Sequence, residues 1–262
     1  MKTALSQAQI RHYRREGFVT LPNLLSPAEV RELKAAVAKG VQAMGKLKVA
    51  GGGKEWEDDD SYYSRVFLQR LNLWKESPTV RKFMLNPALG KMLARLAGVN
   101  RLRVWHDQTL QKAPWANATS WHQDVPYWSF TSKDALSIWI ALDDATLQNG
   151  GLYFLPGTHR KQDYRAIPIG PDMEGLFKLH PKWRKIEPVP VPLKAGSASV
   201  HNGLLAHSAG PNMTPRWRRA MTCAYMPDGC VFNGKKNILS KEQVSRLKVG
   251  DPLNDEVQNP LV

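Results

Sequence analysis

The chain has 262 residues, of which 42% are hydrophobic and 23% are charged. This composition allows one substantial hydrophobic core and excludes a chain that is disordered throughout. The two cysteines, Cys223 and Cys230, exclude a disulfide framework, so we expect ordinary buried or half-buried thiols in a reducing compartment.

The net charge of +14 comes from two segments of the chain. Residues 1–54 carry ten Lys/Arg against three Asp/Glu, and residues 160–220 carry eleven against four. A solubilising surface, an anionic small-molecule substrate and nucleic acid would each account for this excess. Because the sequence contains no zinc finger, RNA-recognition motif or helix-turn-helix pattern, we expect no nucleic-acid partner. No apolar run approaches the roughly 20 residues of a membrane span, so we expect a cytoplasmic protein with no membrane partner.

The N-terminal part predicts helices around one strand. Ser6 and Gln9 form a capping-box pattern, and Gly17 is a helix stop. The segment 18–22 predicts a short strand, and Ser26-Pro27-Ala28-Glu29 begins a second helix. Another helix is expected after Asn86-Pro87, ending at Gly98.

Residues 45–61 predict a mobile loop, because Gly51-Gly52-Gly53 and the acidic run 57–60 cannot bury much surface. After Asn100 the sequence consists of short apolar segments separated by Pro, Gly and Asn, which favours an antiparallel sandwich or barrel. The expected strands are 102–111, 135–142, 152–155, 189–193, 197–201 and 218–226.

Two distant motifs carry the candidate chemistry. In Trp121-His122-Gln123-Asp124, the His and Asp are separated by one residue, so an extended strand would point both side chains at one centre. His207 lies far downstream in His207-Ser208-Ala209-Gly210-Pro211-Asn212. Two imidazoles and one carboxylate form the facial triad that suits Fe(II) and leaves coordination positions open.

Arg218 follows His207 eleven residues later. A bidentate 2-oxo acid and dioxygen can fill the open positions of such a triad. The distal carboxylate of 2-oxoglutarate then needs a cation, and a guanidinium provides a planar, two-pronged donor. Arg218 has the residue type and the place for this role.

These motifs resemble the phytanoyl-CoA dioxygenase family of Fe(II)/2-oxoglutarate oxygenases. The matching stretches are the His122 and His207 motifs, Arg218-Arg219-Ala220, 149–160 with Pro156-Gly157-Thr158-His159-Arg160, and the N-terminal Glu16-Gly17-Phe18-Val19. The resemblance covers roughly residues 5–227 and implies a mainly β fold with α, a double-stranded β-helix (jelly roll) with N-terminal helices packed outside. We expect one oxygenase domain over 1–262, with a mostly helical part (1–100), a jelly-roll core (101–227) and a C-terminal extension (228–262).

By the same resemblance, His122, Asp124 and His207 take the catalytic metal positions and Arg218 takes the 2-oxoglutarate carboxylate position. Trp139 matches a tryptophan that lines the co-substrate pocket, and Gln108 falls where the family places another co-substrate neighbour. The implied cofactors are Fe(II), 2-oxoglutarate and O2. Ala209 stands where the family often has Ser, which removes one hydrogen bond to 2-oxoglutarate.

The implied activity is hydroxylation of a small organic substrate with formation of succinate and CO2. The Asp124 carboxylate favours hydroxylation over chlorination, because related halogenases lack it. Desaturation, cyclisation and epimerisation use the same triad and stay open. A jelly-roll binding module without activity and a zinc hydrolase with the same ligands also stay open, and His201 competes with His207 for the place of distal ligand.

Other residues near these motifs have weaker expectations. Tyr127 and Trp128 belong to an aromatic-rich stretch that either walls a substrate cavity or fills the β core. His106 lies on a predicted strand and could face either way, and His159 is expected to be structural. Lys112, Arg216 and Arg219 could pair with an acidic substrate, but for each of them we expect a solvated surface position.

Overall fold

The computed structural model describes residues 1–50, 62 and 65–262. The Gly51–Gly53 run and the acidic cluster at 57–60, on which the predicted mobile loop rests, lie outside the described residues. Helix α1 (Gln7–Glu16) and helix α2 (Pro27–Met44) both begin with a capping box, made by Ser6 with Gln9 and by Ser26 with Glu29. Gly17 ends α1 in the left-handed conformation, with φ of 90°. The predicted capping signals are therefore confirmed.

The β structure consists of two antiparallel sheets. The larger has six strands in the order β1-β8-β5-β10-β3-β2, and the smaller has four in the order β4-β9-β6-β7. Their bounds are β1 (Phe18–Leu21), β2 (Leu68–Leu71), β3 (Leu102–Lys112), β4 (Thr119–His122), β5 (Leu136–Ala141), β6 (Leu152–Phe154), β7 (Val189–Val191), β8 (Ala198–Asn202), β9 (His207–Ala209) and β10 (Arg218–Pro227). All seven predicted strands exist, to within two residues at each end, whereas β2, β4 and β9 were not predicted.

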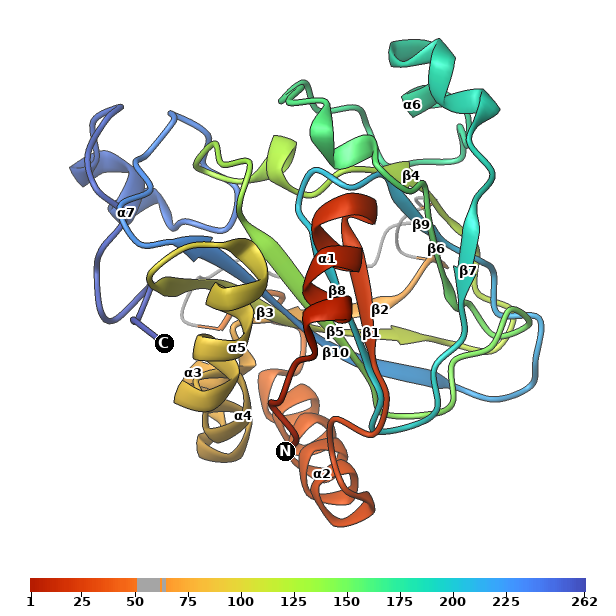
Figure 1. The fold of residues 1–262 in the computed structure, drawn as a ribbon. Helices are drawn as coiled ribbons and strands as arrows, with labels where there is room; N and C mark the ends of the chain where they lie inside the picture. Colours follow the sequence, from red (N-terminus) through yellow and green to blue (C-terminus); the bar gives the residue numbers. More distant parts are fainter. Residues whose placement is uncertain (51–61, 63–64) are drawn as a thin grey trace.

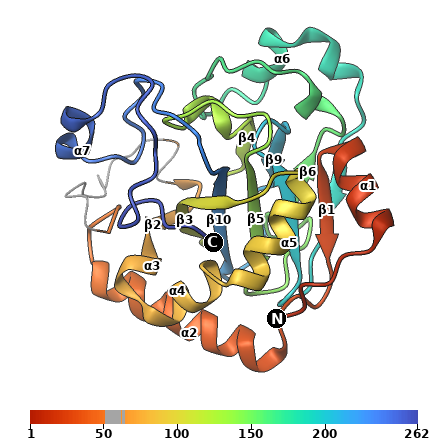
Figure 2. The same ribbon diagram turned by 60° about the vertical axis from the view of Figure 1, so that its left-hand side comes forward.

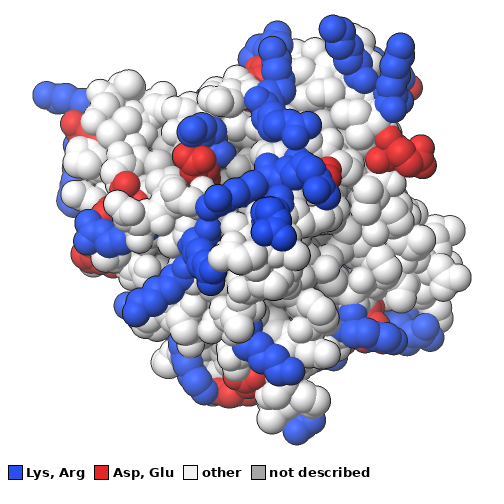
Figure 3. Space-filling view, in the orientation of Figure 1, with Lys and Arg blue, Asp and Glu red and all other residues white. Residues whose placement is uncertain are grey.

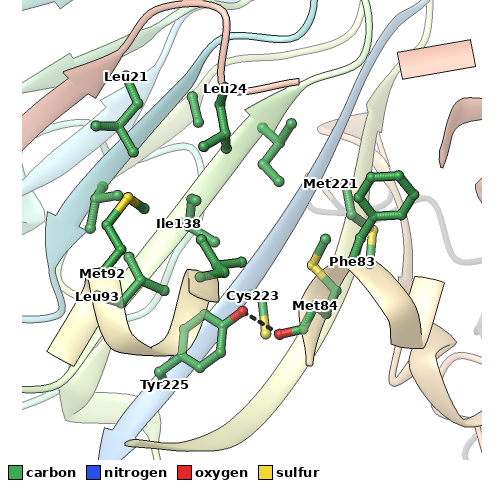
Figure 4. Packing of buried hydrophobic residues seen from close by; sticks show 14 of the residues in the cluster. Leu21, Leu24, Phe83, Met84, Met92, Leu93, Ile138, Met221, Cys223 and Tyr225 are labelled. Carbon is green, nitrogen blue, oxygen red and sulfur yellow. Dashed lines mark hydrogen bonds between the residues drawn. The ribbon is translucent and has the colours of Figure 1, made fainter. Parts of the chain in front are cut away.

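The largest hydrophobic cluster lies between the N-terminal helices and one face of the six-stranded sheet (Figures 1 and 2). Helices α4 (Pro78–Met84) and α5 (Pro87–Ala97) contribute Phe83 and Leu93, which pack with Ile138 and Met221 from the sheet. Figure 4 shows this packing and the hydrogen bond of 2.7 Å that the Tyr225 hydroxyl donates to a main-chain carbonyl of α4. Each such buried side chain contributes about 1.5–3 kcal/mol, so the helices cover this face stably.

The opposite face of the six-stranded sheet points to the interior between the two sheets. Because side chains alternate along a strand, Ile138 and Ile140 of β5 join the helix-side cluster while Trp139 and Ala141 join a second cluster with β6 and β9. This alternation brings polar side chains of β3, β5, β8 and β10 into the interior, where the candidate site lies.

The C-terminal segment packs against the end of the sandwich. Phe232, Leu239 and Leu253 form a cluster with Trp105 and Trp128. Two short helices lie outside the sheets, α6 (Gly175–Leu179) and α7 (Lys241–Arg246), and α3 (Leu73–Glu76) precedes α4. Among the described helices, none is long and apolar enough to cross a bilayer.

Cys223 is buried, Cys230 is partly exposed, and both are free, as expected.

The division of the chain into parts at residues 100 and 227 stays a prediction. Strands β1 and β2, which precede residue 101, form the two edges of the larger sheet.

Candidate metal and co-substrate site

The two sheets bring His122, Asp124 and His207 together. His122 ends β4 and His207 begins β9, and the two residues are direct cross-strand partners. One ligand atom from each of the three residues lies within 4.8 Å of the others. The Asp124 Oδ1 atom is 3.8 Å from His122 Nε2 and 3.6 Å from His207 Nε2.

Asp124 reaches this centre differently from the sequence expectation. An extended strand through both His122 and Asp124 would have pointed the two side chains at one centre, but β4 ends at His122 and Asp124 has right-handed helical backbone angles. The Gly203 carbonyl accepts hydrogen bonds of 2.9 Å from the amides of Asp124 and Val125. A Cβ at Gly203 would lie 2.5 Å from a Val125 methyl, so this close approach requires glycine.

Both triad imidazoles are oriented by main-chain carbonyls. His122 Nδ1 lies 2.8 Å from the Ser120 carbonyl, and His207 Nδ1 lies 2.9 Å from the Leu205 carbonyl. Since a carbonyl only accepts, each Nδ1 carries the hydrogen, and each Nε2 keeps a free lone pair on the side of the centre that Asp124 Oδ1 also faces. Burial lowers the pKa of both imidazoles, which keeps them in the neutral form that binds metal.

The Asp124 carboxylate is ionised. Burial alone would raise its pKa, but the positive charge that His207 and His122 carry when they are protonated, together with the hydrogen bond from His201, lowers that pKa far below the ordinary range. Its second oxygen, Oδ2, accepts hydrogen bonds from Ser137 Oγ at 3.0 Å and from His201 Nε2 at 3.2 Å. Two neutral imidazoles and one carboxylate on one side of an open centre fit divalent iron.

Arg218 lies at the end of the same cavity and is almost fully buried, at 2% exposure. Its guanidinium donates to the carbonyls of Leu110 at 3.1 Å and Gly150 at 3.2 Å, while its Nε is buried with no hydrogen-bond partner. Burial lowers the pKa of Arg218 to about 10, so the group stays charged at neutral pH. Within the described part of the chain this cation forms no ion pair, so it fits the carboxylate of a bound organic acid.

Trp139 and Gln108 line the same cavity as Arg218, and their roles beside the co-substrate stay predictions. The Arg218 guanidinium lies 5.2 Å from the Trp139 ring, a cation–π contact that holds both groups. The Gln108 side chain accepts a hydrogen bond from Gln69 of β2. Thr222 also lines this cavity and was missed, although it shares a face of β10 with Arg218 by the two-residue alternation of a strand.

The cavity has a volume of about 290 Å³ and continues past the triad to an aromatic end. Tyr127, Trp128 and His106 line this end, and Trp128 also belongs to the core cluster around Trp105, so both expectations apply to Trp128. Ile169 and Ile238 also line it and were missed, because they come from irregular segments without a periodic pattern.

The expectation for Lys112 is wrong. This residue is fully buried, and its ammonium donates hydrogen bonds to the carbonyls of Val66 and Asn117. Burial lowers its pKa to about 7, and the nearby Arg218 adds to the effect. Arg219 is only partly exposed and pairs with Asp143 at 3.0 Å. His159 lies outside the cavity, near the backbone of α1.

Comparison with known proteins agrees with this geometry. Residues 13–220, more than three quarters of the chain, match the family model described as phytanoyl-CoA dioxygenase. The peroxisomal phytanoyl-CoA dioxygenase of Homo sapiens is 24% identical, with 94% of this chain and 75% of that protein covered.

Two crystal structures share the fold over nearly the whole chain. The 2-oxoglutarate-dependent carbocyclase SnoK from nogalamycin biosynthesis has a TM-score of 0.80 and 28% identity, covering 98% of this chain and 96% of that one. The epimerase SnoN, solved in complex with Fe3+, 2-oxoglutarate and nogalamycin RO, has a TM-score of 0.74 and 25% identity, covering 97% of each chain. The antiparallel sheets therefore form a jelly-roll core of the 2-oxoglutarate oxygenase type, and the chain belongs to the phytanoyl-CoA dioxygenase family of non-haem iron, 2-oxoglutarate-dependent dioxygenases.

Proposed function

We propose that this protein is an Fe(II)- and 2-oxoglutarate-dependent dioxygenase that hydroxylates a small organic substrate and forms succinate and CO2. His122, Asp124 and His207 are the proposed metal ligands, and Arg218 is the proposed partner of the distal carboxylate. The observation that carries this proposal is the convergence of three metal-ligating atoms in one cavity with a buried guanidinium that forms no ion pair with the described residues.

Bound iron and 2-oxoglutarate supply the oxidising chemistry, using O2 as the oxidant. The chain's own residues place the reactants and exclude water. His122 and His207 present neutral Nε2 atoms, and Asp124 presents Oδ1 between them. Arg218 and Trp139 bind the far end of the keto acid, and Gln108 contributes a polar contact beside them.

The aromatic end of the cavity is the proposed substrate site. The Tyr127 hydroxyl is held by the Ile167 carbonyl, so its ring forms a fixed wall, and Trp128 is only 4% exposed. His106 is buried in this wall, its Nδ1 has no hydrogen-bond partner, and burial lowers its pKa to about 4. A mostly apolar molecule with a hydroxyl or carbonyl group fits this lining.

The support for an anionic substrate comes from the protein surface and not from the cavity lining. Figure 3 shows Lys and Arg side chains in a broad band across the face that carries α1. Within the described cavity lining, however, the cations are Lys48 and Arg218, and Arg218 is assigned to the co-substrate. The basic surface therefore favours steering of an anion over recognition inside the cavity. Cytoplasmic location and the lack of a nucleic-acid partner stay predictions.

Cyclisation or epimerisation is the second proposal for the reaction. The similarity to a carbocyclase and an epimerase over nearly the full chain supports it, because both proteins use this fold. Halogenation is disfavoured by the Asp124 carboxylate, which occupies the side of the centre that a halide would need.

The test is a substrate screen that measures O2-dependent succinate release with Fe(II) and 2-oxoglutarate, followed by mass analysis of the product. Asp124→Ala and His207→Ala should abolish succinate release, while His12→Ala, at a partly exposed position of α1, should retain it. A hydrolase would release product without iron or O2. Activity that survives His207→Ala but is lost in His201→Ala would show that His201 is the distal ligand.

A further inference from the structure

The orientation of the Asp124 side chain depends on contacts from other segments of the chain. Asp124 lies beyond the end of β4, in a turn whose main chain is anchored by the Gly203 carbonyl. Main-chain anchoring does not set the rotation of a carboxylate, and either oxygen could then face the two imidazoles. The side chains around Asp124 therefore decide which oxygen does so.

Two donors on the six-stranded sheet contact the same carboxylate oxygen. Ser137 of β5 and His201 of β8 are direct cross-strand partners, and both point into the interior. Ser137 Oγ and His201 Nε2 both donate to Asp124 Oδ2, at 3.0 Å and 3.2 Å. The other oxygen, Oδ1, is left facing His122 Nε2 and His207 Nε2.

The surroundings of His201 indicate that the polar interaction of its ring is the hydrogen bond to Asp124. The ring lies between the Phe154 ring, at 5.4 Å, and the His207 ring, at 4.5 Å. His201 is 3% exposed, and its buried Nδ1 has no hydrogen-bond partner among the described residues. Its Nε2 lies on the Oδ2 side of Asp124, away from the oxygen that faces the other two imidazoles.

We propose that Ser137 and His201 are positioning residues that hold Asp124 so that it binds iron through Oδ1 alone. This inference rests on the proposed function, because it assumes a metal at His122, Asp124 and His207. Both donors are almost fully buried, at 4% and 3% exposure, so water does not readily replace them. Residues that orient metal ligands typically change metal affinity by about 10–100-fold when they are removed.

The experiment measures metal binding and not turnover. Metal-free protein is titrated anaerobically with Fe(II), and with Mn(II) as a redox-stable probe, by calorimetry. The charge-transfer absorption of the Fe(II)–2-oxoglutarate complex is then recorded for each variant. Ser137→Ala and His201→Ala should each weaken metal binding by roughly tenfold or more, and the double variant should be weaker than either.

Conservative variants separate positioning from a general structural role. Ser137→Thr keeps the hydroxyl, and His201→Gln keeps an N–H donor at a similar reach, so both should recover metal affinity to within a few-fold of wild type. Ser199→Ala is the matched control, because Ser199 is a buried serine on β8 whose hydroxyl has no hydrogen-bond partner in the described part of the chain. It should bind metal like wild type.

The outcomes separate this inference from the proposed function. If wild type binds metal and Asp124→Ala does not, but Ser137→Ala and His201→Ala bind like wild type, the positioning role is refuted and the proposed function stands. If His201→Ala and His201→Gln both lose binding completely, His201 is a ligand and the inference is again refuted. Equal metal binding by wild type and Asp124→Ala would refute the proposed function itself.

Discussion

Replacing Arg218 with methionine should remove most of the thermal stabilisation that 2-oxoglutarate gives to the iron-loaded protein. The guanidinium is buried, charged and without an ion pair among the described residues, so a bound carboxylate would be its counter-ion. Methionine keeps a long apolar side chain against Trp139 and removes the donors.

The size of the effect follows from the lost hydrogen bonds. Each hydrogen bond to a charged group contributes about 1.5–3 kcal/mol, so losing two costs at least about 3 kcal/mol, or roughly 100-fold in affinity. At a 2-oxoglutarate concentration of about 100 times the wild-type Kd, the ligand stabilises wild type by about 2.7 kcal/mol, and a variant bound 100-fold more weakly by about 0.4 kcal/mol. At about 2–4 °C per kcal/mol, the Tm shift should fall from roughly 5–11 °C to about 1 °C.

The assay is thermal unfolding with anaerobic Fe(II), with and without 2-oxoglutarate. Arg219→Met is the matched control, because its guanidinium is the next along β10 but pairs with Asp143. It should keep the full shift. An unchanged shift in Arg218→Met, or an equal loss in both variants, would refute the assignment of Arg218 to the co-substrate.

Two further predictions concern buried charges away from the proposed metal centre. Burial raises the pKa of Asp107 to about 7, so at about pH 9, where the carboxyl is ionised, Asp107→Asn should lower the free energy of unfolding in urea denaturation by about 1–3 kcal/mol. The carboxylate accepts from the amides of Leu73 at 2.7 Å and Trp74 at 2.8 Å, whereas an amide side chain offers only one acceptor oxygen. The exposed Glu76→Gln is its control, and an equal effect of both changes would contradict this account. For Lys112, burial lowers the pKa from 10.5 to about 7, so the unfolded chain binds more protons between these pH values and wild-type stability should rise with pH. Relative to Lys112→Met, wild type should gain roughly 3 kcal/mol between pH 7 and 10, and a pH-independent difference would count against the buried ammonium.

Local signals predicted the helices and the long strands. The capping boxes at Ser6 and Ser26 involve neighbouring residues only, so the sequence is sufficient to read them. The longest strands, β3, β5 and β10, carry enough apolar residues to be recognised. By contrast, β4 and β9 span four and three residues with polar side chains, too few for any periodicity.

The sequence predicted which residues belong to the candidate site but not how the fold brings them together. The motifs indicated His122 and His207 as metal ligands. Their pairing across β4 and β9 depends on the register between two strands that are distant in sequence, which the motifs do not reveal. Lys112 was misplaced because a lysine at a strand end normally reaches solvent, whereas here main-chain carbonyls surround its ammonium. The contacts of Ser137 and His201 with Asp124 were not foreseen, since they join three segments that are distant in sequence.

The two ends of the cavity are built from different kinds of structure. Gln108, Trp139 and Arg218 lie on β3, β5 and β10, which are adjacent strands of one hydrogen-bonded sheet. Tyr127, Ile169, Ile238 and their neighbours come from connecting segments. Insertions and exchanges are tolerated in connections and not in central strands. Proteins that share this fold can therefore change substrate by changes in the connecting segments, while the strands that carry the co-substrate residues stay the same.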